Sequence, residues 1–90
     1  MTGMLVSSKA GHDKGDIYVI IKEETEYVYL VDGRLRTFEK PKKKNKKHIQ
    51  IIKARLETSL LEKMQNGQAD DSEIRKVIKA YKLTQKNQTL

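Results

Sequence analysis

The chain has 90 residues, 37% of them apolar, no cysteine and a formal net charge of +7. This length suits one small domain and excludes two independent cores, which usually need about 100 residues each. Without disulfides or cysteine-based metal sites, a compact sheet or helix pair must supply the stability. The longest apolar run, Ile17–Ile21, is far shorter than the roughly 20 residues that span a bilayer, so we expect a soluble, cytoplasmic protein.

Alternating apolar residues predict strands in the first half of the chain. A short strand at residues 4–6 is followed by alternating segments at 17–21 and 27–31, separated by a turn at 23–25. Both faces of these segments carry apolar side chains. We therefore expect a small closed or strongly bent sheet that makes contacts on both sides.

Two further strands are expected before the helices begin. Asp32-Gly33 is typical of a type I′ hairpin turn, which would join Tyr27–Val31 to a fourth strand at Arg34–Phe38. Pro41 cannot donate a ladder hydrogen bond, which favours a loop for the lysine-rich segment 39–48. A fifth strand is predicted at His48–Ile52.

The apolar spacing changes to a helical period after residue 55. A first helix is predicted by Leu56, Leu60, Leu61 and Met64. It should end at Asn66-Gly67. A second helix is predicted from Asp70, with Glu73 three residues later in a capping box. Its apolar face is formed by Ile74, Val77, Ile78 and Tyr81.

The predicted organisation is one folding unit of the α+β class. It is mostly β over residues 1–55, which include the basic loop 39–48, and it ends in a helical appendage at 56–90. Residues 84–90 are polar enough to fray.

The positive charge is concentrated in one segment. Ten basic side chains and one acidic side chain lie between residues 34 and 55, and six lysines lie within residues 40–47. Such a block repels itself unless an anion is near, and no amphipathic helix or lipidation signal accompanies it. The pattern favours a nucleic acid over a membrane as the partner. The structural alternative is a solvated loop that keeps a small protein in solution.

The loop expected between the first two strands contains two glycines four residues apart. Gly11 can open a turn, and Gly15 can take a positive φ where the chain re-enters a strand. Lys14 would then point outward, with backbone N–H groups near a bound anion. By spacing alone, such a pair is structural more often than functional.

The segment Leu5–Ile20 resembles the KOW motif of ribosomal proteins and transcription elongation factors: an apolar strand, then Gly-x-x-Lys-Gly, then a second apolar strand. With Asp32–Arg36, the lysine-rich segment and the capped last helix, the chain is similar to small bacterial KOW-domain RNA-binding proteins. These are similar to the "fourteen-e" group of large-subunit ribosomal proteins in archaea and eukaryotes. The resemblance covers about residues 3–82. It implies a five-stranded SH3-like barrel that binds RNA, with rRNA of the large ribosomal subunit as the expected partner, possible contacts to ribosomal proteins, and no membrane.

The motif and the charge pattern together define a candidate RNA-binding surface. Its residues are Lys9, Gly11, Lys14, Gly15, Arg34, Arg36, Lys40, Lys42, Lys43, Lys44, Lys46, Lys47 and His48. Asp13 and Asp16 flank Lys14 and would weaken a phosphate contact there, which favours the lysine-rich segment over the first loop. No aromatic residue lies between Phe38 and Tyr81, so we expect contacts to phosphates and RNA shape with little base reading.

Other functions have weaker support in the sequence. Ser7, Ser8, His12 and Asp13 lie too close together along the chain to supply the oriented pairs of a catalytic triad, and two histidines without cysteine do not indicate a metal site. We expect no enzymatic activity, no cofactor and no small-molecule substrate.

Two alternatives to RNA binding remain open. One is a DNA-binding helix-turn-helix with Arg75, Lys76, Lys79 and Lys82 on its second helix. The acidic first turn of that helix opposes it, because carboxylates there repel phosphate. The other is a protein-interaction module of a translation or transcription complex that docks an acidic partner.

Overall fold

The computed structural model describes residues 1–88, which form a five-stranded antiparallel sheet and two α-helices. The elements in chain order are β1 Met4–Ser8, β2 Ile17–Glu23, β3 Tyr27–Val31, β4 Lys42–Asn45, the 3-10 helix η1 Lys46–His48, β5 Ile49–Arg55, α1 Thr58–Gln65 and α2 Asp71–Gln88. The predicted α+β class is confirmed. Within the described chain, neither helix is long and apolar enough to cross a membrane.

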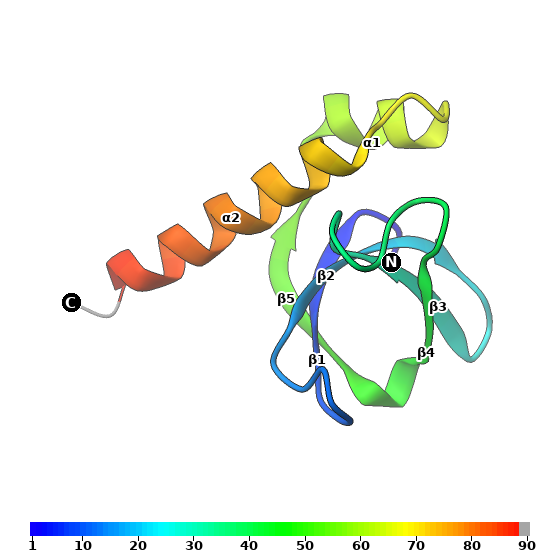
Figure 1. The fold of residues 1–90 in the computed structure, drawn as a ribbon, viewed down its shortest axis with the longest axis vertical. Helices are drawn as coiled ribbons and strands as arrows, with labels where there is room; N and C mark the ends of the chain where they lie inside the picture. The colour runs from blue at the N-terminus through cyan, green and yellow to red at the C-terminus, as the bar shows by residue number, and fades with distance from the viewer. Residues whose placement is uncertain (89–90) are drawn as a thin grey trace.

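The strands lie in the order β4-β3-β2-β1-β5, and each neighbouring pair is antiparallel. Figure 1 shows the sheet strongly bent into an almost ring-shaped arrangement, with α2 lying across its outer side. The sheet is not closed, because β4 and β5 are its edges and only η1 joins them. Of the two expected forms, the sheet is therefore strongly bent, and no backbone hydrogen-bond ladder between β4 and β5 closes it.

Both faces of the sheet carry an apolar cluster, as the alternation of the sequence predicts. Val6 and Ile20 belong to an inner cluster between the curved strands, while their neighbours Leu5 and Val19 belong to an outer cluster. The outer cluster is completed by residues of the helical segment: Leu56, Ile74 and Ile78. Burial of this face holds α2 against the sheet.

The signals that begin and end the helices are confirmed. The Asp70 carboxylate accepts a hydrogen bond from the Glu73 N–H at 2.9 Å, and the Glu73 carboxylate accepts one from the Asp70 N–H at 3.2 Å. This is the reciprocal pair of a capping box. Gly67, with φ +73°, follows the end of α1. Asn66-Gly67 therefore ends the first helix where the sequence predicts it.

The predicted position of the fourth strand is wrong. Residues 34–38 lie in a loop, and β4 occupies Lys42–Asn45, inside the predicted basic loop 39–48. In the described chain only glycines have a positive φ, so Asp32 does not take the type I′ conformation. Its carboxylate instead accepts hydrogen bonds from the N–H groups of Arg34 and Arg36, at 2.8 and 3.0 Å, which folds the chain into a local turn.

The end of the last helix also differs from the expectation. A frayed tail is predicted from residue 84, but α2 continues as a helix to Gln88. The Thr84 hydroxyl donates to the Ala80 carbonyl oxygen at 3.0 Å, one turn back along the helix. The last two residues of the predicted tail, 89–90, lie outside the described residues.

Candidate nucleic-acid interface

Asp13, in the loop between β1 and β2, is turned into the molecule and is only 9% exposed. Its Oδ2 accepts hydrogen bonds from Lys42 Nζ at 2.6 Å and from the Tyr18 hydroxyl at 3.2 Å. Its Oδ1 accepts from Lys44 Nζ and from Ser8 Oγ, both at 2.8 Å. These bonds tie the β1–β2 loop to the edge strand β4 and place a polar network beside the inner cluster.

The network fixes the charge state of Asp13. Burial raises the pKa of its carboxyl, but the hydrogen bonds from Lys42, Lys44 and Ser8 outweigh that cost and hold the pKa well below its usual range. For Tyr18, burial raises the pKa of the phenol, and the Asp13 charge raises it further. Two ammonium groups therefore face one ionised carboxylate and one neutral phenol, which leaves a surplus of positive charge.

The lysines of β4 are divided between the two faces of the strand. The side chains of Lys42 and Lys44 are 27% and 10% exposed, and both ammonium groups bind Asp13. Lys43 points the other way, with 51% of its side chain exposed and Nζ at 4.6 Å from the centre of the Tyr27 ring. Alternation on a strand explains this division, which a loop would not produce.

Lys46 is also engaged within the protein. Its ammonium group lies 2.7 Å from a Glu23 carboxylate oxygen, while the other oxygen of Glu23 accepts from the N-terminal amine at 2.9 Å. The Lys46 hydrogen bond, followed by that of the terminal amine, lowers the pKa of Glu23. Four of the lysines expected to bind RNA thus contact carboxylates distant in the sequence, the weakest being Lys43, whose Nζ lies 3.9 Å from a Glu24 oxygen. No local pattern reveals these pairings.

The glycines of the β1–β2 loop have the expected conformation, but the backbone around them does not have the expected donors. Gly11 and Gly15 have φ values of +87° and +89°. The N–H groups of Lys14, Gly15 and Asp16, however, donate to carbonyl oxygens within or beside the loop, at 2.8 to 3.3 Å. These three N–H groups are therefore bonded within the protein, and the two glycines serve the tight turn.

Three exposed lysines gather around this loop, and we call them the loop patch: Lys9, Lys14 and Lys47. The Lys9 N–H donates to the His48 carbonyl oxygen at 2.8 Å, which joins the loop to η1 and brings the two segments together. The inward turn of Asp13 removes one of the two carboxylates expected to oppose Lys14. Asp16 remains exposed at the surface.

The remaining predicted cations, Arg34, Arg36 and Lys40, are exposed on the loop between β3 and β4. This loop packs on α2. Arg75 Nη1 donates to the Gly33 carbonyl oxygen at 2.6 Å, and the Phe38 N–H donates to the Asp71 carboxylate at 3.0 Å.

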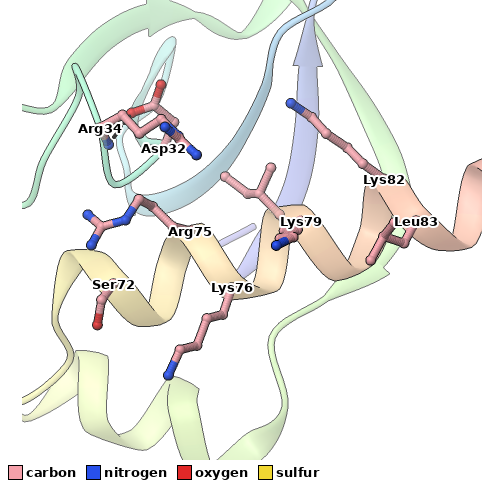
Figure 2. A pocket seen from close by; sticks show the side chains of 9 residues that line it. Asp32, Arg34, Ser72, Arg75, Lys76, Lys79, Lys82 and Leu83 are labelled. Carbon is pink, nitrogen blue, oxygen red and sulfur yellow. Dashed lines mark hydrogen bonds between the residues drawn. The ribbon is translucent and has the colours of Figure 1, made fainter.

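Because of this packing, Arg34 lies with the basic side chains of α2, on the other side of one groove (Figure 2). Three of these helix cations are Arg75, Lys79 and Lys82. From the sequence alone, these three cations belong only to the helix-turn-helix alternative. Their spacing of four and then three residues, which places them on one side of a helix, is the signal that could have identified them.

No protein-family model and no curated protein matches this sequence. The resemblance to KOW-domain proteins therefore stays a prediction from the motif residues alone.

Proposed function

We propose that the protein binds RNA by contacting the phosphate backbone, and that it acts as a ribosome-associated protein in the cytoplasm. The observation that carries this proposal is the loop patch. Its three exposed lysines lie beside a network in which two lysines face a single carboxylate. The local electrostatic potential is therefore positive. Nucleic acids carry one negatively charged phosphate per nucleotide, which makes them a suitable partner for such a surface.

An SH3-like barrel of the KOW type is part of this proposal. It is supported by the strand order, with β5 beside β1, and by the bend that encloses the inner apolar cluster. The two glycines of the Gly-x-x-Lys-Gly loop, both with positive φ, also support it. The ion pairs from Asp13 to Lys42 and Lys44 add a link between the β1–β2 loop and the edge strand β4.

The binding should depend strongly on salt. Each lysine that neutralises a phosphate releases a counterion, and for single strands the log–log slope falls by about 0.7 per contact. If the three lysines of the loop patch each contact a phosphate, their removal should reduce the magnitude of the slope by about 2 for single-stranded RNA and by about 2.7 for a duplex stem. Lys42 and Lys44 act indirectly in this scheme, because their ammonium groups hold Asp13.

Fluorescence anisotropy with a labelled RNA stem-loop tests the proposal. We expect the variant Lys9→Gln/Lys14→Gln/Lys47→Gln to bind at least about tenfold more weakly at low salt and to show the shallower slope. The control Lys22→Gln/Lys53→Gln/Arg55→Gln has the same change of net charge at exposed positions outside the loop patch. Equal losses in both variants, or no RNA binding by the unchanged protein, would overturn the proposal.

The ribosomal part of the proposal is tested separately. In a sucrose gradient of cell lysate, the protein should sediment with large subunits at low salt and leave them at high salt, because phosphate contacts are screened. Ribonuclease should release it. A protein that stays at the top of the gradient at low salt would contradict ribosome association and leave only binding to free RNA.

A further inference from the structure

A groove of about 530 Å³ runs between α2 and the loop that follows β3. Figure 2 shows Arg34 and Asp32 on the loop above the helix, Arg75 and Lys79 on the helix below them, and Lys82 extending toward the strands. Lys76 also lines the groove, but in this view its ammonium group points away from the loop. The groove is separate from the loop patch, whose lysines are not among its lining residues.

The rim of the groove is strongly cationic. Five of its residues are basic: Arg34, Arg75, Lys76, Lys79 and Lys82. Asp32 is the one acidic residue among those that line the groove, and its Oδ1 already accepts two backbone hydrogen bonds from its own loop. One of the five N–H donors of the Arg75 guanidinium bonds to the Gly33 carbonyl oxygen, which leaves the other four for a ligand. This excess of positive charge selects an anionic ligand.

The floor of the groove is apolar. Ile78 is 7% exposed where its side chain joins the outer cluster, and Leu83, five residues further along α2, is 51% exposed. Next to Arg34, Leu35 is 87% exposed at the surface of the loop. An apolar floor below cations is a suitable site for a chain of ribose and base with phosphates at its edge, because arginine and lysine keep their charged ends above their aliphatic stems.

The two walls of the groove are held together before any ligand arrives. Gly33 approaches α2 so closely that a Cβ at this position would clash with the Asp71 carbonyl oxygen and with the Arg75 side chain. The Arg75–Gly33 and Phe38–Asp71 hydrogen bonds fix the same contact. A preformed groove binds with a smaller loss of conformational entropy than a mobile loop.

We propose that this groove binds a single strand of RNA, with consecutive phosphates along Arg75, Lys79 and Lys82 and with Arg34 closing over the strand. The proposal rests on the proposed function and adds a second surface to it. The three helix cations repeat at about one helical turn, 5.4 Å along the axis, which is close to the spacing of neighbouring phosphates. Guanidinium groups on both walls favour phosphate, which they bind through two parallel hydrogen bonds.

The test is the affinity for a short, fluorescein-labelled oligouridylate. The variant Lys79→Gln/Lys82→Gln should bind at least about fivefold more weakly than the unchanged protein, with a salt slope reduced in magnitude by about 1.4. The control Lys22→Gln/Lys53→Gln removes the same charge from exposed positions that do not line the groove, and should change the affinity less than about twofold. Both variants should keep the melting temperature of the unchanged protein.

The possible outcomes separate this inference from the proposed function. A loss in the groove variant that exceeds the loss in the control supports the inference. If RNA binds but the two variants behave alike, the inference is overturned while the loop patch can still bind RNA. If an oligoglutamate peptide of equal charge binds as tightly as the oligouridylate and loses as much in the groove variant, the groove is a site for an acidic protein, which overturns the inference.

Discussion

The two lysine-rich segments of this chain, β4 with η1 and the exposed side of α2, present their charges in different ways. In the first segment, Lys42, Lys44 and Lys46 all contact carboxylates of other elements at 2.6 to 2.8 Å. In the second, Lys79 and Lys82 are exposed beside an apolar groove. The denser run of lysines therefore offers fewer ammonium groups to a ligand than its composition suggests.

The difference has a local cause. A strand sends alternate side chains to opposite faces, so half of a lysine run on an edge strand must point toward the interior and needs a partner there. Asp13 supplies that partner for two lysines. A surface helix has one face on the core and the other in solvent, so its cations stay exposed while Ile74 and Ile78 are buried. The same charge is structural on β4 and available on α2.

Among variants that test this contrast, we expect the removal of the Asp13 carboxylate to lower the free energy of unfolding the most. Asp13→Ala leaves Lys42 and Lys44 without a counter-charge in a partly buried place, and we expect a loss of about 3 kcal/mol in the free energy of unfolding. Urea denaturation measures it. Asp16→Ala removes an exposed carboxylate from the same loop and should cost less than about 0.5 kcal/mol. Equal effects of the two variants would show that the Asp13 ion pairs contribute nothing.

A substitution in the contact between the β3–β4 loop and α2 should cause the next largest loss in the free energy of unfolding. Gly33→Ala places a methyl group against the helix backbone and retains an unfavourable φ of +79°, so we expect a loss of about 2–3 kcal/mol. Gly67→Ala shares the positive φ but meets open space, and should cost about 1 kcal/mol. Thermal or urea unfolding compares the two. A Gly67 variant as unstable as the Gly33 variant would contradict the close loop–helix contact.

Acid should lower the stability of the fold by protonating Asp13 and so removing its ion pairs with the lysines of β4. Because the folded-state pKa of this carboxyl is lowered, its contribution to stability is fully present above its unfolded-state pKa, about 4, and is lost as the pH falls toward the folded-state value. Urea denaturation between about pH 6 and pH 2.5 should show this decline. Asp13→Asn should be less stable at neutral pH and show a smaller decline. A parallel decline in both proteins would assign the acid sensitivity to other groups.

The smallest predicted effect concerns the start of α2. Asp70→Ala removes the oxygen that accepts the Glu73 N–H, and we expect a loss of about 1 kcal/mol, as for other N-caps. Glu57, at the start of α1, makes no side-chain cap hydrogen bond, so Glu57→Ala should cost clearly less. Helix content by circular dichroism and urea unfolding compare the two. A larger loss for Glu57 would contradict the capping assignment.

Local patterns predicted much of this fold. The alternation in β1 to β3, the capping box and the tight loop at Gly11 and Gly15 all depend on residues within a few positions of one another, which a sequence displays directly. The position of β4 could not be predicted in this way. Its lysines form a strand because Asp13, about thirty residues earlier, accepts the inward-facing pair.

The candidate site was predictable to a similar extent. The cations of the β1–β2 loop and Arg34 were identified from the motif and the charge pattern, and the structure leaves them exposed. The groove was not predictable, because it exists only where Gly33 packs on Arg75, 42 positions later in the chain. Contacts of this range depend on how the whole sheet bends, which local propensity does not determine.

The central claim, that exposed cations of α2 and of the β1–β2 loop bind RNA while the inward lysines of β4 hold the fold, can be tested in one NMR titration. A short oligouridylate would be added to isotope-labelled protein while the side-chain signals of lysine and arginine are followed. We predict shifts at Lys9, Lys14, Arg34, Lys79 and Lys82, with Lys42 and Lys44 retaining their signals. Shifts concentrated on Lys42 and Lys44, with the α2 and loop signals unchanged, would contradict the claim.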